Sequence, residues 1–190
     1  FWTYLKQKTK RICNMAFDHS LDPLISLDHW VQEAAKNGVP EPNAMSLATV
    51  SADLQPANRI VLYKGIVRGG LSFYTNYQGQ KAREMEFNPR VAVNFFWAPL
   101  ARQIRILGVV SKLTRSESEA YFKSRARVSQ LGAWASQQSD EVSGIDALTA
   151  RFKEVEKKFN GAEVPCPPFW GGYQLMPNYF EFWISREGRL

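Results

Sequence analysis

The segment Arg59-Ile60-Val61-Leu62-Tyr63-Lys64 joins an apolar, β-branched interior to a cation at each end. Side chains of a strand alternate between its faces, so one face carries Arg59, Val61 and Tyr63 and the other Ile60, Leu62 and Lys64. Each face is therefore predicted to end in one cation. Because a charge set into an apolar strand is costly to desolvate without a partner, an anionic ligand explains this pattern better than the fold alone. A phosphate-bearing cofactor is the first candidate.

Polar side chains recur in the segments that follow, at Tyr74, Thr75, Asn76, Lys81 and Gln103. The chain has no Gly-rich phosphate fingerprint, zinc-ligand spacing or nucleophile elbow, so the predicted metal set is empty. Both histidines, His19 and His29, lie in the N-terminal region, which argues against a His-based triad. A polar set without a strong acid or base suits a cofactor that does its own chemistry, in redox or group transfer.

Five segments rich in β-branched and aromatic residues are predicted to be strands: Met45–Val50, Ala57–Tyr63, Leu71–Thr75, Arg90–Trp97 and Arg102–Lys112. Two more are expected near the C-terminus, Trp170–Met176 and Tyr179–Ile184, after a Pro-rich loop over Val164–Pro168. Short turns such as Asp53-Leu-Gln-Pro56 connect the first five, and short connections favour antiparallel pairing. The pattern predicts a mainly β protein with helices, built as an antiparallel barrel.

Four helices are predicted. The first follows Ser26, with Leu27, Trp30, Val31, Ala34 and Ala35 at helical spacing and Gly38 as its end. A short helix is expected over Gln80–Phe87. The sequence Thr114-Arg-Ser-Glu117 is a capping box that opens a third helix through Phe122. A fourth is expected over Ile145–Phe159, and no internal repeat or interdomain linker is evident.

The hydrophobic content, net charge and cysteine count of the chain limit the kinds of partner that it is expected to bind. The 190 residues are 45% hydrophobic, enough for one domain with a full core, and no apolar run is long enough to span a membrane. The net charge of +6 favours anionic partners, but 18 acidic residues are interleaved with 24 basic ones, unlike a nucleic-acid-binding tract. Cys13 and Cys166 form neither a disulfide framework nor a metal spacing, which favours the cytoplasm.

Several stretches, in order, resemble the pyridoxine (pyridoxamine) 5′-phosphate oxidases. They are Arg59–Lys64, Phe73-Tyr-Thr-Asn76, Asn88-Pro-Arg-Val91, Arg102-Gln-Ile104, Tyr121-Phe-Lys-Ser-Arg125, Ser129-Gln-Leu-Gly-Ala-Trp134, Gln138-Ser139, Glu163-Val-Pro165, Phe169-Trp-Gly-Gly172 and Glu181-Phe-Trp183. The resemblance runs from about Asp22 to Leu190. It implies one FMN-binding split-barrel domain over 22–190, an obligate homodimer and FMN at the subunit interface. Residues 1–21 are then an N-terminal arm, with Met15 as a candidate start.

The resemblance also implies roles for individual residues. The implied FMN contacts are Arg59, Ile60, Val61, Leu62, Tyr63, Lys64, Tyr74, Thr75, Lys81, Gln103, Gln138, Ser139 and Trp183. The implied substrate contacts are Lys64, Tyr121, Arg125, Ser129 and Arg189, with Arg189 also catalytic. The implied reaction passes a hydride from the C4′ carbon of pyridoxamine or pyridoxine 5′-phosphate to the flavin, and oxygen then yields hydrogen peroxide. Cations and hydroxyls of this kind suit two phosphate groups.

The chain departs from the family pattern at two places. Gln80 stands where the family usually has Arg, which predicts weaker FMN retention. The chain ends at Arg189-Leu190, where the family continues through His, Asp and Arg into a final strand, which predicts lower activity for the chain as given.

Each polar residue also has a purely structural explanation. Lys64 is long enough to reach solvent from a strand end, Arg125 and Arg127 suit a solvated helix end, and Gln103 suits backbone hydrogen bonding. Trp134, Trp170 and Trp183 are more often core residues than cofactor stackers, and Phe95-Phe-Trp97 suits a core or a dimer interface.

Three alternative functions remain open. One is a split-barrel flavin oxidase with another substrate, of the phenazine-pathway type. A second is a non-catalytic binder of FMN or pyridoxal phosphate. The third is a single-strand nucleic-acid binder that uses basic and aromatic side chains on a barrel.

Overall fold

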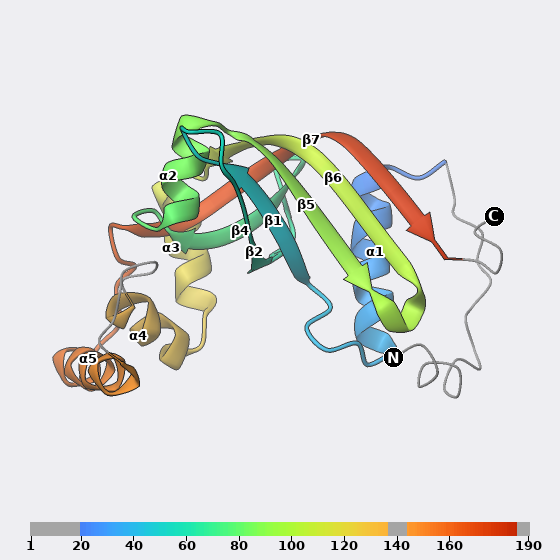
Figure 1. Ribbon diagram of the computed structural model, residues 1–190. Helices are drawn as coiled ribbons and strands as arrows, with labels where there is room; N and C mark the ends of the chain where they lie inside the picture. The colour runs from blue at the N-terminus through green and yellow to red at the C-terminus, as the bar shows by residue number, and fades with distance from the viewer. Residues whose placement is uncertain (1–19, 137–143, 186–190) are drawn as a thin grey trace.

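The computed structural model describes residues 20–136 and 144–185 (Figure 1). Its strands are β1 (Ala44–Val50), β2 (Pro56–Leu62), β3 (Ile66–Val67), β4 (Gly70–Asn76), β5 (Arg90–Trp97), β6 (Arg102–Lys112) and β7 (Trp170–Ile184). Its helices are α1 (Pro23–Lys36), α2 (Gln80–Phe87), a 3₁₀ turn η2 (Ala98–Leu100), α3 (Arg115–Ser124), α4 (Arg127–Ala135) and α5 (Ile145–Lys158). The first five predicted strands are confirmed to within one residue at each end, whereas β3, η2 and α4 were not predicted.

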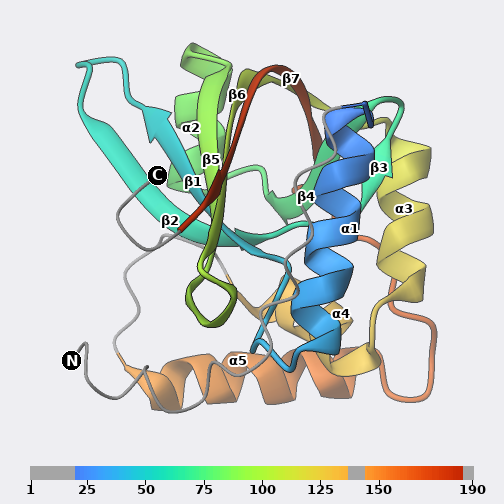
Figure 2. The ribbon, with the colours of Figure 1, turned by 90° about the vertical axis from the view of Figure 1, so that its right-hand side faces the viewer.

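The strands form one antiparallel sheet in the order β2-β1-β5-β6-β7-β4-β3. The sheet curls until the chain leaving β2 meets β4, where the amide of Lys64 donates to the carbonyl of Ser72 at 2.9 Å. The amide of Ser72 donates in turn to the carbonyl of Gly65, also at 2.9 Å. These bonds bring the chain that leaves β2, one end of the strand order, against β4 near the other end, so the predicted antiparallel barrel is confirmed (Figure 2).

Helix α1 begins earlier than predicted. Asp22 is its N-cap and accepts a hydrogen bond from the amide of Leu24 at 2.7 Å, and Pro23 occupies the first turn. Ser26 is buried within the helix and is not its cap. An Asp cap followed by Pro is a stronger start signal than Ser26, because Pro needs no intrahelical donor at that position. The helix ends at Lys36, before Gly38 at a φ of 70°.

The two predicted C-terminal strands are one strand, and that prediction was wrong. Strand β7 pairs with β4 over Trp170–Leu175 and with β6 over Tyr173–Ile184, and the register with β6 shifts between Leu107 and Gly108, opposite Pro177. Pro177 has no N–H to donate, but a bulge accommodates it without ending the strand. A Cβ at Gly108 would lie 2.3 Å from the carbonyl oxygen of Met176, so the bulge requires glycine there.

Two hydrophobic cores hold the molecule together. The larger fills the barrel and the space under α1, where Trp30 packs edge-on against Trp97 and Phe182 at 6.3 and 5.2 Å. Phe95 and Trp97 belong to this core, whereas Phe96 between them is 59% exposed. The smaller core lies among α3, α4 and α5, around Phe122 and Leu131, and Figure 1 places α4 and α5 away from α1. The molecule therefore has a helical lobe beside a barrel.

The helix predictions hold elsewhere. The capping box is formed, because Thr114 accepts from the amide of Glu117 and the Glu117 carboxylate accepts from the amide of Thr114. Within residues 20–136 and 144–185, no helix is long and apolar enough to cross a membrane. The predicted arm lies almost wholly outside the described residues, and the division into 1–21 and 22–190 stays a prediction, as does a cytoplasmic location.

Candidate functional site

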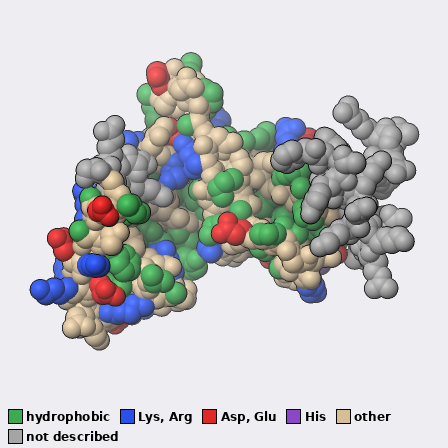
Figure 3. Space-filling model, turned by 60° about the horizontal axis from the view of Figure 1, so that its bottom comes forward, with side chains coloured by type: hydrophobic (Ala, Val, Ile, Leu, Met, Phe, Trp, Pro, Cys, Tyr) green, Lys and Arg blue, Asp and Glu red, His purple; other side chains and the backbone are tan. Residues whose placement is uncertain are grey.

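A cavity of about 920 Å³ lies between β2 and β4 of the barrel and α2, α3 and α4. From below the view of Figure 1, the surface is hollowed between the helical lobe and the barrel (Figure 3). Eleven of the predicted site residues line the cavity: Arg59, Ile60, Val61, Leu62, Lys64, Tyr74, Thr75, Lys81, Tyr121, Arg125 and Ser129. Residues from distant parts of the sequence therefore meet in one place.

The alternation predicted for β2 is confirmed. Val61 and Tyr63 are buried, whereas Ile60 and Leu62 are exposed. Arg59 and Lys64 nevertheless line the same cavity. The strand ends at Leu62, and the chain turns at Gly65, whose φ is 93°, so Lys64 no longer follows the pleat of β2. That each face ends in its own cation stays a prediction, because residues of both faces of β2, among them Val61 and Leu62, line this cavity.

Arg59 has a partner within the chain. Its Nη2 lies 2.8 Å from Oε2 of Glu84 on α2, and its Nη1 donates to the hydroxyl of Thr49 and, at 3.4 Å, to the carbonyl of Leu47. An anionic ligand was expected to explain this cation better than the fold alone, and the fold itself already supplies one partner, Glu84. Glu84 was not predicted as a site residue, although it follows Gln80 by one helical turn.

Glu84 is the anion at the centre of a buried network. Its Oε1 accepts from Gln80 at 2.7 Å, and its Oε2 accepts from Thr49 at 2.5 Å and from Arg59. Burial by itself raises the pKa of this carboxyl, but the hydrogen bonds from Thr49, Arg59 and Gln80 outweigh burial and leave the pKa below its ordinary value. Gln80, the position of the family departure, thus binds an internal anion.

Lys81 lies beside this network and is 6% exposed. Its Nζ donates to the hydroxyl of Thr75 at 3.3 Å. Burial and the neighbouring Arg59 cation lower the pKa of Lys81, and Glu84 offsets part of that effect. Arg59, Lys81 and Thr75 together form the first cationic end of the cavity, which suits an anion because two cations and one carboxylate leave a net positive charge.

The opposite wall is aromatic. The rings of Tyr74 and Tyr121 stack with centroids 3.8 Å apart, and Tyr74 also stacks on Trp170 at 5.4 Å. Burial raises the pKa of Tyr74 to about 12. Trp170 therefore lines the cavity as well as the smaller core, so the core interpretation covers only part of its role. Gly172 makes the packing possible, because a Cβ there would lie 2.7 Å from the Tyr74 ring.

Arg125 forms the second cationic end. Its guanidinium carbon lies 4.7 Å from the Trp170 ring centroid and 5.6 Å from that of Phe122. Its Nη1 is buried and has no hydrogen-bond partner among the described residues. Burial lowers the pKa of this group. Ser129, on the first turn of α4, lines the cavity with it. An anionic ligand would supply the hydrogen-bond acceptor that this buried guanidinium donor lacks.

Three predicted residues lie elsewhere. Tyr63 is buried in the barrel, where its hydroxyl donates to Asp28 at 2.6 Å. Gln103 and Trp183 do not line the cavity; they are direct cross-strand neighbours on β6 and β7. Gln138, Ser139 and Arg189 lie outside the described residues. His29 is exposed on α1 and does not line the cavity.

Gln103 and Trp183 belong to an apolar outer face of the sheet. Phe96 is the other cross-strand neighbour of Gln103, and Trp183 is 44% exposed. Other large exposed apolar residues on β6 and β7 are Leu107, Val109, Met176 and Tyr179. Such a concentration on one sheet exceeds the scattered exposure that needs no explanation.

Comparison with known proteins agrees with this geometry. Residues 31–159 match the family model described as pyridoxamine 5′-phosphate oxidase. The pyridoxine/pyridoxamine 5′-phosphate oxidase of Rubrobacter xylanophilus is 50% identical over 169 residues, 89% of this chain and 78% of that protein. The protein of the same name from Bdellovibrio bacteriovorus is 46% identical over 174 residues, 92% of this chain and 89% of its own.

Solved structures support the fold. PhzG from Burkholderia lata 383, in complex with tetrahydrophenazine-1-carboxylic acid, superposes with a TM-score of 0.86 at 30% identity, over 93% of this chain and 89% of that one. A pyridoxamine 5′-phosphate oxidase-related, FMN-binding protein from Nostoc punctiforme PCC 73102 has a TM-score of 0.69 at 16% identity, over 86% and 84%. The predicted split-barrel fold is confirmed, and this chain belongs to the pyridoxamine 5′-phosphate oxidase family.

Proposed function

We propose that this protein is an FMN-dependent oxidase that converts pyridoxamine or pyridoxine 5′-phosphate to pyridoxal 5′-phosphate. The observation that carries the proposal is the pair of cationic ends in one cavity, Arg59 with Lys81 and Arg125 beside Ser129. A phosphorylated cofactor and a phosphorylated substrate require two such ends. The names of the relatives from Rubrobacter xylanophilus and Bdellovibrio bacteriovorus support the same substrate class.

The residues present fit FMN. Arg59, Lys81 and the Thr75 hydroxyl supply donors for a terminal phosphate, and Lys81 is nearly as buried as a core residue. Bound FMN would supply the redox chemistry, as the acceptor of a hydride from C4′ of the substrate and the donor of two electrons to oxygen, which would give hydrogen peroxide. With the amine, water then replaces the nitrogen, which leaves as ammonia.

The chain's own residues bind and orient. Arg125 and Ser129 would hold the substrate phosphate, and Lys64 lies at the end of β2 within the same cavity. The nearly parallel rings of Tyr74, Tyr121 and Trp170 give the cavity an apolar wall for a planar ring. The polar groups orient the ligand, while the aromatic wall excludes water from one side.

The proposal includes a homodimer. Gln103 and Trp183, implied FMN contacts, lie on the exposed apolar face and outside the cavity of their own chain. A second copy that covered this face would bury Phe96 and Trp183 and bring a glutamine to a site otherwise built by the first copy. The site would then need both copies.

The deciding experiment measures FMN content and substrate turnover. The purified protein is titrated with FMN, and hydrogen peroxide is then measured with pyridoxamine 5′-phosphate, pyridoxine 5′-phosphate and their unphosphorylated forms. We expect turnover of the phosphorylated compounds only. An FMN-loaded protein without turnover would support the alternative of a non-catalytic binder. A colourless protein that binds oligonucleotides in a salt-sensitive way would support the alternative of a nucleic-acid binder.

A second candidate function follows from the similarity to PhzG, whose structure holds tetrahydrophenazine-1-carboxylic acid. The aromatic wall of Tyr74, Tyr121 and Trp170 suits a flat polycyclic acid as well as a pyridine. The same turnover assay with that compound distinguishes the two candidate functions. Arg125→Ala should abolish the preference for a phosphate ester, but it should have less effect on a carboxylate that lies elsewhere in the cavity.

A further inference from the structure

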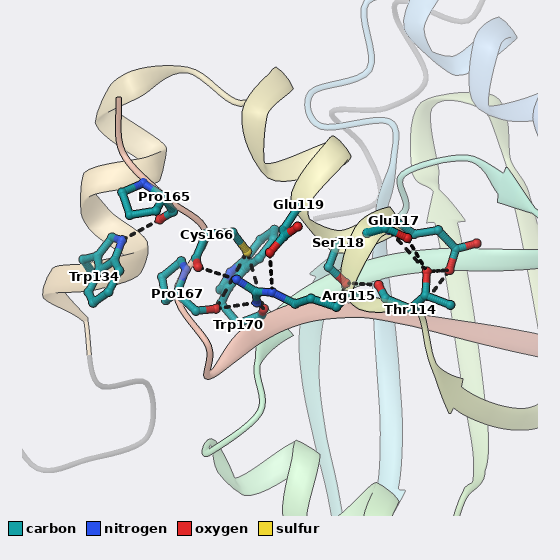
Figure 4. A network of polar contacts seen from close by, with 12 residues as sticks. Thr114, Arg115, Glu117, Ser118, Glu119, Trp134, Pro165, Cys166, Pro167 and Trp170 are labelled. Atoms are coloured by element: carbon teal, nitrogen blue, oxygen red, sulfur yellow. Dashed lines mark hydrogen bonds and ion pairs between the residues drawn. The ribbon is translucent and has the colours of Figure 1, made fainter. Parts of the chain in front are cut away.

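The loop over residues 163–170 forms the rear of the aromatic wall, and its backbone is fastened at several points (Figure 4). The carbonyl of Pro165 accepts from the indole of Trp134 on α4 at 2.8 Å, and that of Phe169 accepts from the amide of Tyr77 at 2.7 Å. Three carbonyls of this loop, at Cys166, Pro167 and Trp170, accept from one side chain, Arg115.

Arg115 is the first residue of α3, immediately after the Thr114 cap. Its Nη1 donates to Pro167 at 2.8 Å and to Trp170 at 3.3 Å, and its Nη2 donates to Cys166 at 2.5 Å. Its Nε donates to the Glu119 carboxylate at 2.7 Å, one turn along the helix. Every nitrogen of the guanidinium is used, and the planar fork joins α3 to the loop.

Arg115 does not line the cavity, but Trp170, whose carbonyl accepts a hydrogen bond from Arg115, does. Trp170 is 6% exposed, its ring stacks on Tyr74, and the guanidinium of Arg125 packs against the same ring. Arg125 forms no ion pair among residues 20–136 and 144–185. Its position in the cavity therefore depends on packing against Trp170 and Phe122.

We propose that Arg115 is a positioning residue for the second phosphate site: it fixes the backbone at Trp170, and Trp170 fixes Arg125. The inference rests on the proposed function, in which Arg125 binds the substrate phosphate. A guanidinium that stacks on a displaced ring would no longer present its donors to a dianion, because hydrogen bonds weaken steeply when they are misaligned.

The chain offers a matched control in Arg127, the first residue of α4. Its Nη1 donates to the carbonyl of Ala162 at 2.8 Å and its Nη2 to that of Phe159 at 2.6 Å. It is likewise an arginine that fastens a loop through backbone carbonyls, but neither acceptor belongs to a residue that lines the cavity. A general loss of stability would follow from either variant, whereas a change in phosphate binding should follow only from Arg115.

The substitutions are Arg115→Lys and Arg127→Lys. Lysine keeps the charge but is a point donor and cannot hold several carbonyls with a planar fork. The probe is 4-deoxypyridoxine 5′-phosphate, which has no oxidisable group at C4′, compared with 4-deoxypyridoxine. Binding to the FMN-loaded protein is followed by the flavin absorbance, with FMN affinity and thermal unfolding measured on the same samples.

We expect Arg115→Lys to weaken binding of the phosphorylated probe about tenfold, within the range of couplings between residues in contact. Affinities for FMN and for the unphosphorylated probe should change by less than about twofold, as should every affinity in Arg127→Lys. In an Arg125→Ala background, Arg115→Lys should have no further effect on the phosphorylated probe.

An equal loss in the Arg125→Ala background, or an equal loss for both probes, would overturn the inference, because Arg115 would then act on the fold in general. If Arg115→Lys does not fold, Trp170→Phe tests the same link, with the same expected loss for the phosphorylated probe alone. A wild-type protein that binds FMN but not the phosphorylated probe would refute the proposed function itself, and the inference with it.

Discussion

Arg59 on β2 and Glu84 on α2, 25 residues apart, form a partly buried ion pair with 2.8 Å between Nη2 and Oε2. The pair places a carboxylate inside the cavity end that is proposed to receive the FMN phosphate. Two cations, Arg59 and Lys81, outnumber it. The internal anion balances one of the two positive charges, and the remaining positive charge is available to a phosphate.

Removal of the Glu84 charge should destabilise the protein and change its response to acid. The folded-state pKa of Glu84 is lowered, so its stabilisation is fully present above the ordinary pKa of about 4.5 and is lost as pH falls through the folded value. Glu84→Gln should reduce the free energy of unfolding at pH 7 by about 1.5–3 kcal/mol and flatten the decline below pH 4.5. Urea denaturation between pH 3 and about 8 measures both effects.

The control for that variant is Glu86→Gln. Glu86 lies on the same helix, pairs with Lys112 at 3.7 Å and is 73% exposed. Its substitution should leave both stability and the acid decline nearly unchanged, because exposed ion pairs contribute little. An equal effect of the two substitutions would mean that the buried network has no special role.

Arg59→Ala should weaken FMN binding about ten- to hundredfold, the loss of one charge-assisted contact of about 1.5–3 kcal/mol. The variant also leaves Glu84 buried without its cation, so Arg59→Ala combined with Glu84→Gln is the matched protein for comparison. Fluorescence titration of FMN gives the affinities. Unchanged affinity in both variants would remove Arg59 from the cofactor site.

FMN affinity should decline at alkaline pH, and the decline should begin at a lower pH in the wild-type protein than in the Lys81→Arg variant. Burial and Arg59 lower the pKa of Lys81, and a bound phosphate would favour the charged form. Binding therefore weakens as pH rises through the pKa of Lys81 in the free protein, and Lys81→Arg should move that decline to higher pH. Ionisation of the flavin itself is common to both proteins. Coincident pH profiles would show that Lys81 does not contact the phosphate.

Arg125→Lys should weaken binding of pyridoxal 5′-phosphate about tenfold, because an ammonium cannot reproduce the planar, two-donor geometry of a guanidinium stacked on Trp170. Binding of pyridoxal, which lacks the phosphate, should be nearly unaffected. Equilibrium dialysis of both ligands gives the comparison. Equal affinities of wild type and variant for the phosphate ester would mean that Arg125 is a surface charge and does not bind the phosphate.

Phe96→Glu should separate the proposed dimer and release FMN. Phe96 is 59% exposed on the apolar face beside Gln103, and a carboxylate buried between two copies would be strongly unfavourable. Ile145→Glu, at a position 74% exposed on α5, is the control and should remain dimeric. Light scattering gives the mass, and a Phe96→Glu dimer with full FMN content would place the interface elsewhere.

Local sequence patterns were sufficient to predict most of the helices and strands and the residue types of the site. The alternation over Arg59–Lys64 predicts the buried and exposed faces of β2, and Thr114-Arg-Ser-Glu117 predicts the start of α3, because both patterns depend on neighbours within a few residues. Lys81 was singled out among the polar side chains of the sequence, whereas Tyr121 and Arg125 were identified through a resemblance whose motifs extend along the chain. The break predicted at Pro177 failed because the partner strand β6 keeps β7 continuous through a bulge.

Which of these residues act together depends on the arrangement of the folded chain. Nothing in the local sequence links Arg59 to Glu84, Arg115 to the carbonyls of residues 166–170, or Gln103 to an outer face away from the cavity. Such relationships depend on closure of the sheet and packing of the helical lobe, which bring distant segments within a few ångströms. Local periodicity predicts which face of a strand or helix a side chain occupies. A charged group or a hydrogen-bond donor meets its partner only when the chain has folded around it.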